Sequence, residues 1–403
     1  MAALVVAEGA AWLLRPKDEP IEPVSVSERA YFGEAQLERA EDFRDGQRLI
    51  GLGALAVEGG ALLLLALWRP APVRRAFDLA ARRPLLGAAV VGAGISLTLT
   101  VAGLPLGALA HERARDVGLS TQSLAPWLGD RGRAAAIGAG LAALAAAAAM
   151  ALLRRLGSRF WIGGAALAVA GVAAFTWLAP VLLAPVFNRF EPLQEGRLRA
   201  EVLELGRRAG VDIGEVYRVD ASRRSTALNA YVDGLGPTKR VVLYDNAISE
   251  LSPAELRSVV AHELGHVKGD DIRRGLLFVA LVAPLGMLFA QRLAMALARR
   301  TGDNAGEPAV LPALALSVAL AAFVLTVPGN RLSRDVESRA DAFALELTAD
   351  PAALVALQRR LAIANVGDPS PPAVSHFVFG THPTTMERIG AAVAFERRRP
   401  DRP

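Results

Sequence analysis

Two histidines and a glutamate form a compact group in the stretch His262-Glu263-Leu264-Gly265-His266. Residues i and i+4 share one face of an α-helix, so both imidazoles can bind one Zn²⁺ while Glu263 lies beside its open coordination position. That carboxylate can accept a proton from a water molecule that the metal activates. The chain has only five histidines, and a chance match to H-E-x-x-H is expected on the order of 0.003 times. The alternative is a surface helix with two unrelated histidines.

A catalytic zinc site needs three protein ligands and one open position, so a third ligand must come from elsewhere. The sequence contains no cysteine, which leaves histidine and carboxylate side chains. No histidine continues the motif on the H-E-x-x-H-x-x-G-x-x-H plan, because Gly269 is followed by Asp270-Asp271-Ile272. We therefore expect the third ligand on a second helix.

The stretch Ser333–Asp341 offers such a ligand. Glu337 and Asp341 lie four residues apart and would share one helical face. Glu337 would bind the metal, while Asp341 would accept the other ring N–H of a ligating histidine and fix its orientation. Taken alone, this stretch is more typical of an ordinary solvated charged face, so the assignment depends on further features of the chain.

The elements that must position these residues belong mostly to a membrane. Hydrophobic residues make up 53% of the chain without counting its 37 glycines, and the mean hydropathy is +0.32. Soluble domains average about 45–50% apolar residues with glycine included. Apolar runs of about 20 residues, enough to cross roughly 30 Å of hydrocarbon as a helix, recur along the sequence. We expect seven spans: a short first one within residues 1–14, then Leu49–Trp68, Leu85–Ala110, Ala134–Leu153, Phe160–Phe187, Gly275–Leu297 and Ala309–Val327.

Prolines and polar residues occur inside several of these runs. Pro180, Pro185 and Pro284 predict kinks rather than breaks, because neighbouring helices in a membrane can satisfy the freed carbonyl groups. Glu58 is expected to face the interior or the interface rather than to act in catalysis. Gln291 lies near the end of its helix.

Three stretches are polar enough for water, at 15–48, 188–274 and 328–403. The second predicts a mixed α/β fold, in which Ser252 caps the helix of the histidine motif and Glu255 completes a capping box. Its other predicted elements are the helix Arg197–Arg208 and the strands Glu215–Val219 and Arg240–Tyr244. The third stretch predicts a helix over 333–348 and a short helix after Pro383.

The predicted fold class is a predominantly α-helical integral membrane protein with about seven transmembrane helices and a small α/β zinc-metalloprotease domain. We divide the chain into four regions. They are an N-terminal membrane region (1–187), the first part of the peptidase domain (188–274), two further spans (275–327) and the second part of the peptidase domain (328–403).

The chain resembles a known family. H-E-L-G-H, followed 71 residues after His266 by an E-x-x-x-D helix with two apolar runs between, is similar to the integral-membrane zinc metallopeptidases that include the CAAX prenyl proteases. Five apolar runs precede the motif, and this number favours the type I CAAX prenyl protease branch over the HtpX branch, which has fewer. Further segments similar to the type I branch are Leu183–Leu193, Asn229–Tyr231, Lys239–Asp245 and Thr381–Pro383 with Arg388.

The resemblance covers most of residues 183–390 and implies roles by position. His262, His266 and Glu337 would hold one Zn²⁺ per chain, with Glu263 as the general base. Asp341 would lie behind the metal as the partner of a ligand.

The resemblance also implies residues that contact the substrate. Asn229, Ala230 and Tyr231 correspond to the family's edge strand, along which an extended substrate pairs by β-augmentation. His382 and Arg388 correspond to the C-terminal S-H-P…R element and would stabilise the oxyanion. Their alternatives are a buried histidine and a helix-surface arginine.

Three other positions complete the comparison. Thr381 stands where the family usually has serine, and this departure leaves His382 in place. His376 and His111 have no counterpart and are expected in a loop and at the membrane edge.

The sequence thus predicts a membrane-embedded zinc metalloendopeptidase that acts on peptides or proteins, including those with a lipidated or hydrophobic C-terminus. An HtpX-like protease of membrane-protein quality control is the alternative within the family. A transporter would show two similar halves with broken spans, which the sequence lacks. A non-catalytic scaffold would be expected to have lost a ligand or the base, and all four positions are present.

The positions of the basic residues indicate which partners the chain has and how it is oriented in the membrane. Arginines cluster at the ends of apolar runs and only 6% of residues are aromatic, so we expect membrane lipid and no nucleic acid as a partner. Arg15 and Lys17 after the first run place the zinc domain in the cytoplasm, as the family resemblance also implies. The arginines of 69–83 and 154–159 favour the reverse orientation.

Overall fold

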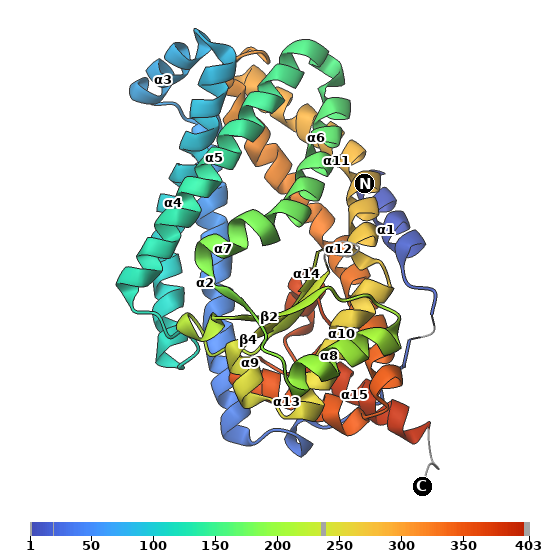
Figure 1. Ribbon diagram of the computed structural model, residues 1–403. Helices are drawn as coiled ribbons and strands as arrows, with labels where there is room; N and C mark the ends of the chain where they lie inside the picture. The colour runs from blue at the N-terminus through green and yellow to red at the C-terminus, as the bar shows by residue number, and fades with distance from the viewer. Residues whose placement is uncertain (1, 19, 235–238, 399–403) are drawn as a thin grey trace.

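The protein consists of a bundle of long helices with a small sheet and shorter helices packed at one end (Figure 1). The computed structural model describes residues 2–18, 20–234 and 239–398. The long helices contain the apolar runs, and the sheet lies in the polar stretch that precedes the histidine motif. This architecture confirms the predicted fold class, a mainly helical membrane protein with a small α/β part.

Six helices carry the apolar runs that follow the first one. They are α2 (Glu34–Leu67), α4 (Pro84–Asp116), α5 (Leu124–Leu156), α6 (Phe160–Leu178), α11 (Asp271–Thr301) and α12 (Leu311–Thr348). Among the described residues, five helical stretches have the length and hydropathy of a membrane span, with α5 and α6 counted in one stretch, Leu124–Phe187. The chain turns at Gly157, where φ is +52°, and α6 then folds back along α5 (Figure 1).

The predicted number of seven spans is therefore approximate. The first apolar run forms α1 (Ala2–Leu14), whose 13 residues cover about 20 Å as a helix, less than the roughly 30 Å of a bilayer core. α1 packs against α11 and α12. Large side chains on the other spans, such as Val90, Leu144 and Phe175, are exposed. Such faces are expected where helices contact lipid.

Prolines lie inside several spans without ending them. Pro284 lies inside α11, and Pro328 lies inside α12. Pro180 lies in a π-helical segment, η3 (Ala179–Leu183), which leads into α7 (Ala184–Phe187). The apolar run that was predicted as one kinked helix thus continues through the π-helical segment and ends at Phe187 in α7, above the sheet (Figure 1).

The two polar side chains noted inside the runs have different surroundings. The Gln291 amide is buried and accepts from the Trp161 backbone N–H at 2.8 Å while donating to the Gly157 carbonyl at 3.1 Å. It therefore fixes the turn between α5 and α6 against α11. Glu58 is half-buried in α2 beside Gly103 of α4.

A four-stranded sheet packs against the part of the chain that carries the histidines. Its order is β1-β2-β4-β3. The strands are β1 (Phe190–Pro192), β2 (Glu215–Val219), β3 (Ala230–Asp233) and β4 (Arg240–Tyr244), and β2 and β4 have the predicted bounds. β2 and β4 are parallel, whereas β1 and β3 pair antiparallel with their neighbours. β3 is thus an edge strand, and no described strand pairs with its other side.

Shorter helices surround this sheet. They are α8 (Arg197–Ala209), α9 (Asp245–Glu250), α10 (Pro253–Lys268), α13 (Pro351–Ala364), α14 (Ala373–Phe379) and α15 (Thr385–Arg397). The remaining short elements are α3 (Ala71–Ala81) and the 3₁₀ turns η1 (Glu28–Ala30), η2 (Gly157–Arg159), η4 (Ala221–Arg223) and η6 (Pro308–Val310). Val216, Val241 and Leu243 of the sheet are fully buried in the same core as Val260 and Leu264 of α10. This core fixes the histidine helix against the sheet.

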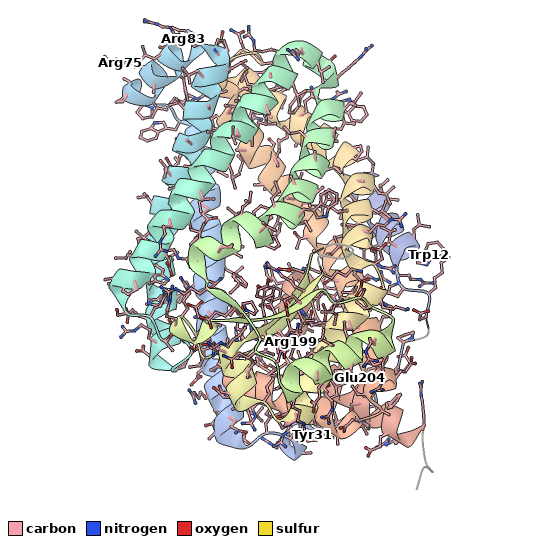
Figure 2. The ribbon with its side chains drawn as sticks, viewed as in Figure 1. Trp12, Tyr31, Arg75, Arg83, Arg199 and Glu204 are labelled. Atoms are coloured by element: carbon pink, nitrogen blue, oxygen red, sulfur yellow. The ribbon has the colours of Figure 1, made fainter. Side chains whose placement is uncertain are left out.

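Two long helices join the membrane part to the sheet part. The apolar run of α12 ends at Val327, and the same helix continues to Thr348 with a total length of about 57 Å. The boundaries predicted at 274/275 and 327/328 fall inside α11 and α12. Figure 2 shows Arg75 and Arg83 at one end of the molecule and Arg199 and Glu204 at the other.

Candidate metal centre

The helix that carries the histidine motif begins with a complete capping box. Ser252 Oγ accepts from the Glu255 backbone N–H at 3.3 Å, and Glu255 Oε2 accepts from the Ser252 backbone N–H at 2.7 Å. Pro253 occupies the first helical turn, where its missing N–H costs nothing. α10 therefore begins at the predicted place and carries His262 and His266 on one face, with their Nε2 atoms 3.2 Å apart.

Helix α12 brings the predicted third ligand to these two rings. Glu337 is 7% exposed, and its carboxylate oxygens lie 3.2 Å from His262 Nε2 and 3.5 Å from His266 Nε2. The approach depends on Gly265, because a Cβ atom there would lie 3.1 Å from the Cα atom of Ala340. Two segments 71 residues apart thus meet at one point.

The three side chains fit a tetrahedral metal ion. Tetrahedral zinc with ligands at 2.0–2.1 Å places those ligand atoms about 3.3 Å apart, close to the distances between His262, His266 and Glu337. All three ligand atoms lie within 4.8 Å of one another. Glu337 Oε2 is buried without a hydrogen-bond partner in the described residues, an arrangement that a bound cation would satisfy.

Each histidine donates a hydrogen bond from its Nδ1–H group to a carboxylate. His262 Nδ1 lies 2.8 Å from Asp341 Oδ1, which was predicted, and His266 Nδ1 lies 3.0 Å from Asp271 Oδ2. Because a carboxylate only accepts hydrogen bonds, each Nδ1 carries the proton and each Nε2 lone pair points toward Glu337. The sequence analysis did not identify Asp271 as such a partner.

Arginines hold these two carboxylates in turn. Arg388 donates through Nε and Nη2 to Asp341 at 2.7 and 2.6 Å, and Arg339 donates to Asp271 at 2.6 Å. Burial opposes the charge of Arg388, but Asp341 outweighs that effect and raises the pKa of Arg388. The guanidinium of Arg388 thus lies on Asp341, behind the candidate metal site.

Glu263 lies on the open side of the histidine pair. With His266 and Glu337 it lines a cavity of about 690 Å³ whose other walls include Phe278 and Val336. Burial raises the pKa of Glu263, although the neighbouring histidines oppose that shift. A raised pKa makes this carboxylate a stronger proton acceptor.

The edge strand β3 borders the same cavity. Val232 and Gly234 line it, while Ala230 is buried and Tyr231 packs edge-on against Tyr244 of β4. Asn229 precedes the strand, and its carbonyl accepts from the Tyr244 backbone N–H at 3.2 Å. The later part of the strand thus lines the cavity, whereas the predicted residues Asn229, Ala230 and Tyr231 are not among its lining residues.

The C-terminal histidine predicted at the site reaches it. His382 is half exposed, and its Nε2 lies 3.3 Å from Glu337 Oε1. Burial lowers the pKa of His382 and favours the neutral ring. His376 lies in α14 rather than in the expected loop, and His111 stacks on Trp127 near the end of α4.

The family model for peptidase family M48 matches residues 192–396, just over half of the chain, and spans both helices of the site. The chain belongs to peptidase family M48. It is thus a metallopeptidase, and the group formed by His262, His266 and Glu337 is the place in the described residues where the family's metal fits.

Relatives of known sequence come from several branches of this family. The chain is 31% identical over 300 residues to the uncharacterized metalloprotease YhfN of Bacillus subtilis, covering 73% of this chain and 70% of that protein. It is 34% identical over 224 residues to the CAAX prenyl protease 1 homolog of Oryza sativa, covering 53% of this chain and 51% of that protein. A protease HtpX homolog of Tropheryma whipplei is 32% identical over 211 residues, or 48% of this chain and 70% of that protein. The chain thus spans about half the length of the plant relative.

One solved structure shares the whole fold. The crystal structure of Ste24p from S. mikatae has a TM-score of 0.76, covering 97% of this chain and 96% of that chain at 18% identity. The likeness extends over the membrane helices as well as the sheet. Together with the apolar helices, it supports an integral membrane protein.

Proposed function

We propose that this M48 peptidase is a zinc metalloendopeptidase that hydrolyses peptide bonds with an activated water molecule. Two histidines and one glutamate are a typical ligand set for catalytic zinc. The observation that carries the proposal is the convergence of His262, His266 and Glu337 at separations of 3.2–3.5 Å, which suit a tetrahedral ion. When bound, zinc would polarise the scissile carbonyl and make water nucleophilic at neutral pH.

The side chains of the chain would move the protons and stabilise the charge. Glu263 would take a proton from the attacking water and return it to the leaving amine. The Nε2–H of His382, beside Glu337, would donate to the oxyanion. We assign Arg388 to the support of Asp341, because both of its short hydrogen bonds go to that carboxylate.

We propose that the substrate binds as an added strand on β3. The free edge of this strand, which includes Ala230 and Tyr231 after Asn229, supplies backbone groups for an extended peptide. The cavity beside Glu263 has apolar walls from Phe278 and Val336, which suits hydrophobic side chains. A protein with a lipidated or hydrophobic C-terminus would match this environment, with membrane lipid as the second partner.

We place the zinc domain on the cytoplasmic side of the membrane. The basic residues that follow α1, Arg15 and Lys17, support this orientation. The arginine-rich segments at 69–83 and 154–159 lie at the opposite end of the molecule and would then be outside.

An HtpX-like function in membrane-protein quality control is the second candidate. The match to HtpX homologues, which covers 48% of the chain, favours it. The two candidates differ in substrate rather than in chemistry. Mass spectrometry of membrane proteins that accumulate in cells with Glu263→Gln separates them, because prenylated proteins accumulate in one case and damaged membrane proteins in the other.

The proposed chemistry is tested on the purified protein in detergent. We expect about one zinc per chain and cleavage of a hydrophobic peptide that a chelator abolishes and zinc restores. Zinc binding without cleavage would indicate a non-catalytic scaffold. If the protein shows neither zinc binding nor cleavage, a transporter remains as the alternative.

A further inference from the structure

The loop that presents His382 is fixed from three sides by residues without an assigned role. It follows α14, whose last carbonyl groups point toward α12. Asn330 Nδ2 donates to the Val378 carbonyl at 2.7 Å, and Arg334 Nη1 donates to the Gly380 carbonyl at 2.6 Å. A cation at a helix C-terminus is favoured by the helix dipole and satisfies carbonyls that lack helical partners.

The His376 side chain closes this loop on itself. Its Nε2 lies 2.8 Å from the His382 carbonyl oxygen, which can only accept, so Nε2 carries the proton. Gly380 leaves the space that the His376 ring fills, because a Cβ atom there would overlap the ring. The backbone of His382 is thereby held at a fixed position relative to α12, the helix that carries Glu337.

The Thr381 hydroxyl then fixes the orientation of the His382 ring. Its Oγ1 lies 2.8 Å from His382 Nδ1, and the Glu337 carboxylate lies 3.3 Å from His382 Nε2. The Thr381 hydroxyl thus holds the ring at Nδ1, and the ring is turned with Nε2 toward Glu337. A serine hydroxyl could form the same hydrogen bond to Nδ1, whereas valine has the same shape as threonine and cannot form it.

We propose that Thr381 is a positioning residue that holds the His382 ring with Nε2 facing the candidate metal site, on a loop fixed by His376 and Arg334. The role rests on the proposed peptidase function. It concerns the residues around His382 rather than the metal ligands.

The test compares Thr381→Val, Thr381→Ser and His382→Ala with the wild type in peptide cleavage. We expect Thr381→Val to lower kcat about tenfold with little change in KM, because one neutral hydrogen bond is lost. Thr381→Ser should retain most of the activity, and zinc content should be unchanged in all variants. Thr385→Val is the matched control, since the structure gives its hydroxyl no hydrogen bond to any described residue.

A double-mutant cycle distinguishes positioning from general stabilisation. If Thr381 acts through His382, Thr381→Val has no further effect in the His382→Ala protein. An equal loss in both backgrounds, a normal kcat in Thr381→Val, or reduced zinc content in that variant would overturn the role. A wild type without zinc-dependent cleavage would instead overturn the proposed function and this role with it.

Discussion

The side chains around His262 form a chain of contacts in which each side chain restricts the orientation of the next. Arg388 holds Asp341, Asp341 holds the ring of His262, and the ring faces Glu337. The spacing of the H-E-x-x-H motif predicted the pair of histidines and the position of Glu263. Glu337 was found through its spacing from Asp341 and through the family resemblance. Spacing alone was not enough, because many solvated helices carry acidic residues at the same spacing.

Some residues at this scale could not be predicted from the sequence. Asp271 reaches His266 only because Asp270 adopts a left-handed conformation, with φ of +54°, between α10 and α11. Arg339 contacts both Asp271 and the Gly265 carbonyl across the helix crossing. Neither contact follows from a periodic pattern, since both depend on how the two helices meet.

The role of Glu263 gives the clearest prediction for a single side chain. Glu263→Gln keeps the size of the side chain but removes the proton acceptor. We expect zinc to remain bound and peptide cleavage to fall by about 10²–10⁴-fold. The measurement pairs metal content with turnover of the same sample. Turnover comparable to the wild type would show that another group is the base.

At the scale of elements, the site is made where α10 crosses α12. Gly265 and Ala340 are the contact point, and α10 is fixed from the other side by the sheet core around Val241 and Leu264. The crossing therefore determines how far Glu337 lies from the histidines.

A larger side chain at Gly265 should separate the two helices. The added Cβ of Gly265→Val would press on the Cα of Ala340, which cannot rotate away, and overpacking of this kind costs about 1–3 kcal/mol. We expect a lower melting temperature and reduced zinc content. Gly171→Val is the control, because no described atom lies within 4 Å of its added Cβ. Equal zinc content and stability in both variants would contradict this account of the crossing.

Sequence patterns predicted some elements better than others. β2 and β4 have the predicted bounds, because their residues alternate or are continuously apolar between turn signals. The helix over 333–348 was expected to stand apart from the preceding span, but α12 continues through Pro328. A proline and a change to polar residues look like a helix end in the sequence, whereas tertiary packing can carry the helix across them.

At the scale of the whole molecule, the two ends have different character. One end holds the arginine-rich turns near Arg75 and Arg83, and the other holds the sheet and α8 with Arg199 and Glu204 (Figure 2). The apolar helices lie between them. Composition predicted this membrane part and the separate runs before and after Gly157, but the shortness of α1 leaves the number of spans approximate.

The orientation can be measured with single cysteines, because the chain has none of its own. We expect Arg75→Cys to react with a membrane-impermeant maleimide on intact cells and Glu204→Cys to react only after the cells are opened. This result follows if the sheet end lies in the cytoplasm. The opposite labelling pattern would place the candidate metal site outside.

The central claim is that Glu337 completes a zinc site with His262 and His266. The most direct measurement is the zinc content of purified Glu337→Ala beside the wild type, after equal exposure to a chelator and to zinc. We predict about one zinc per chain in the wild type and little in the variant, because the two histidines alone leave the ion without its third protein ligand. Full zinc occupancy in Glu337→Ala would contradict the site described here.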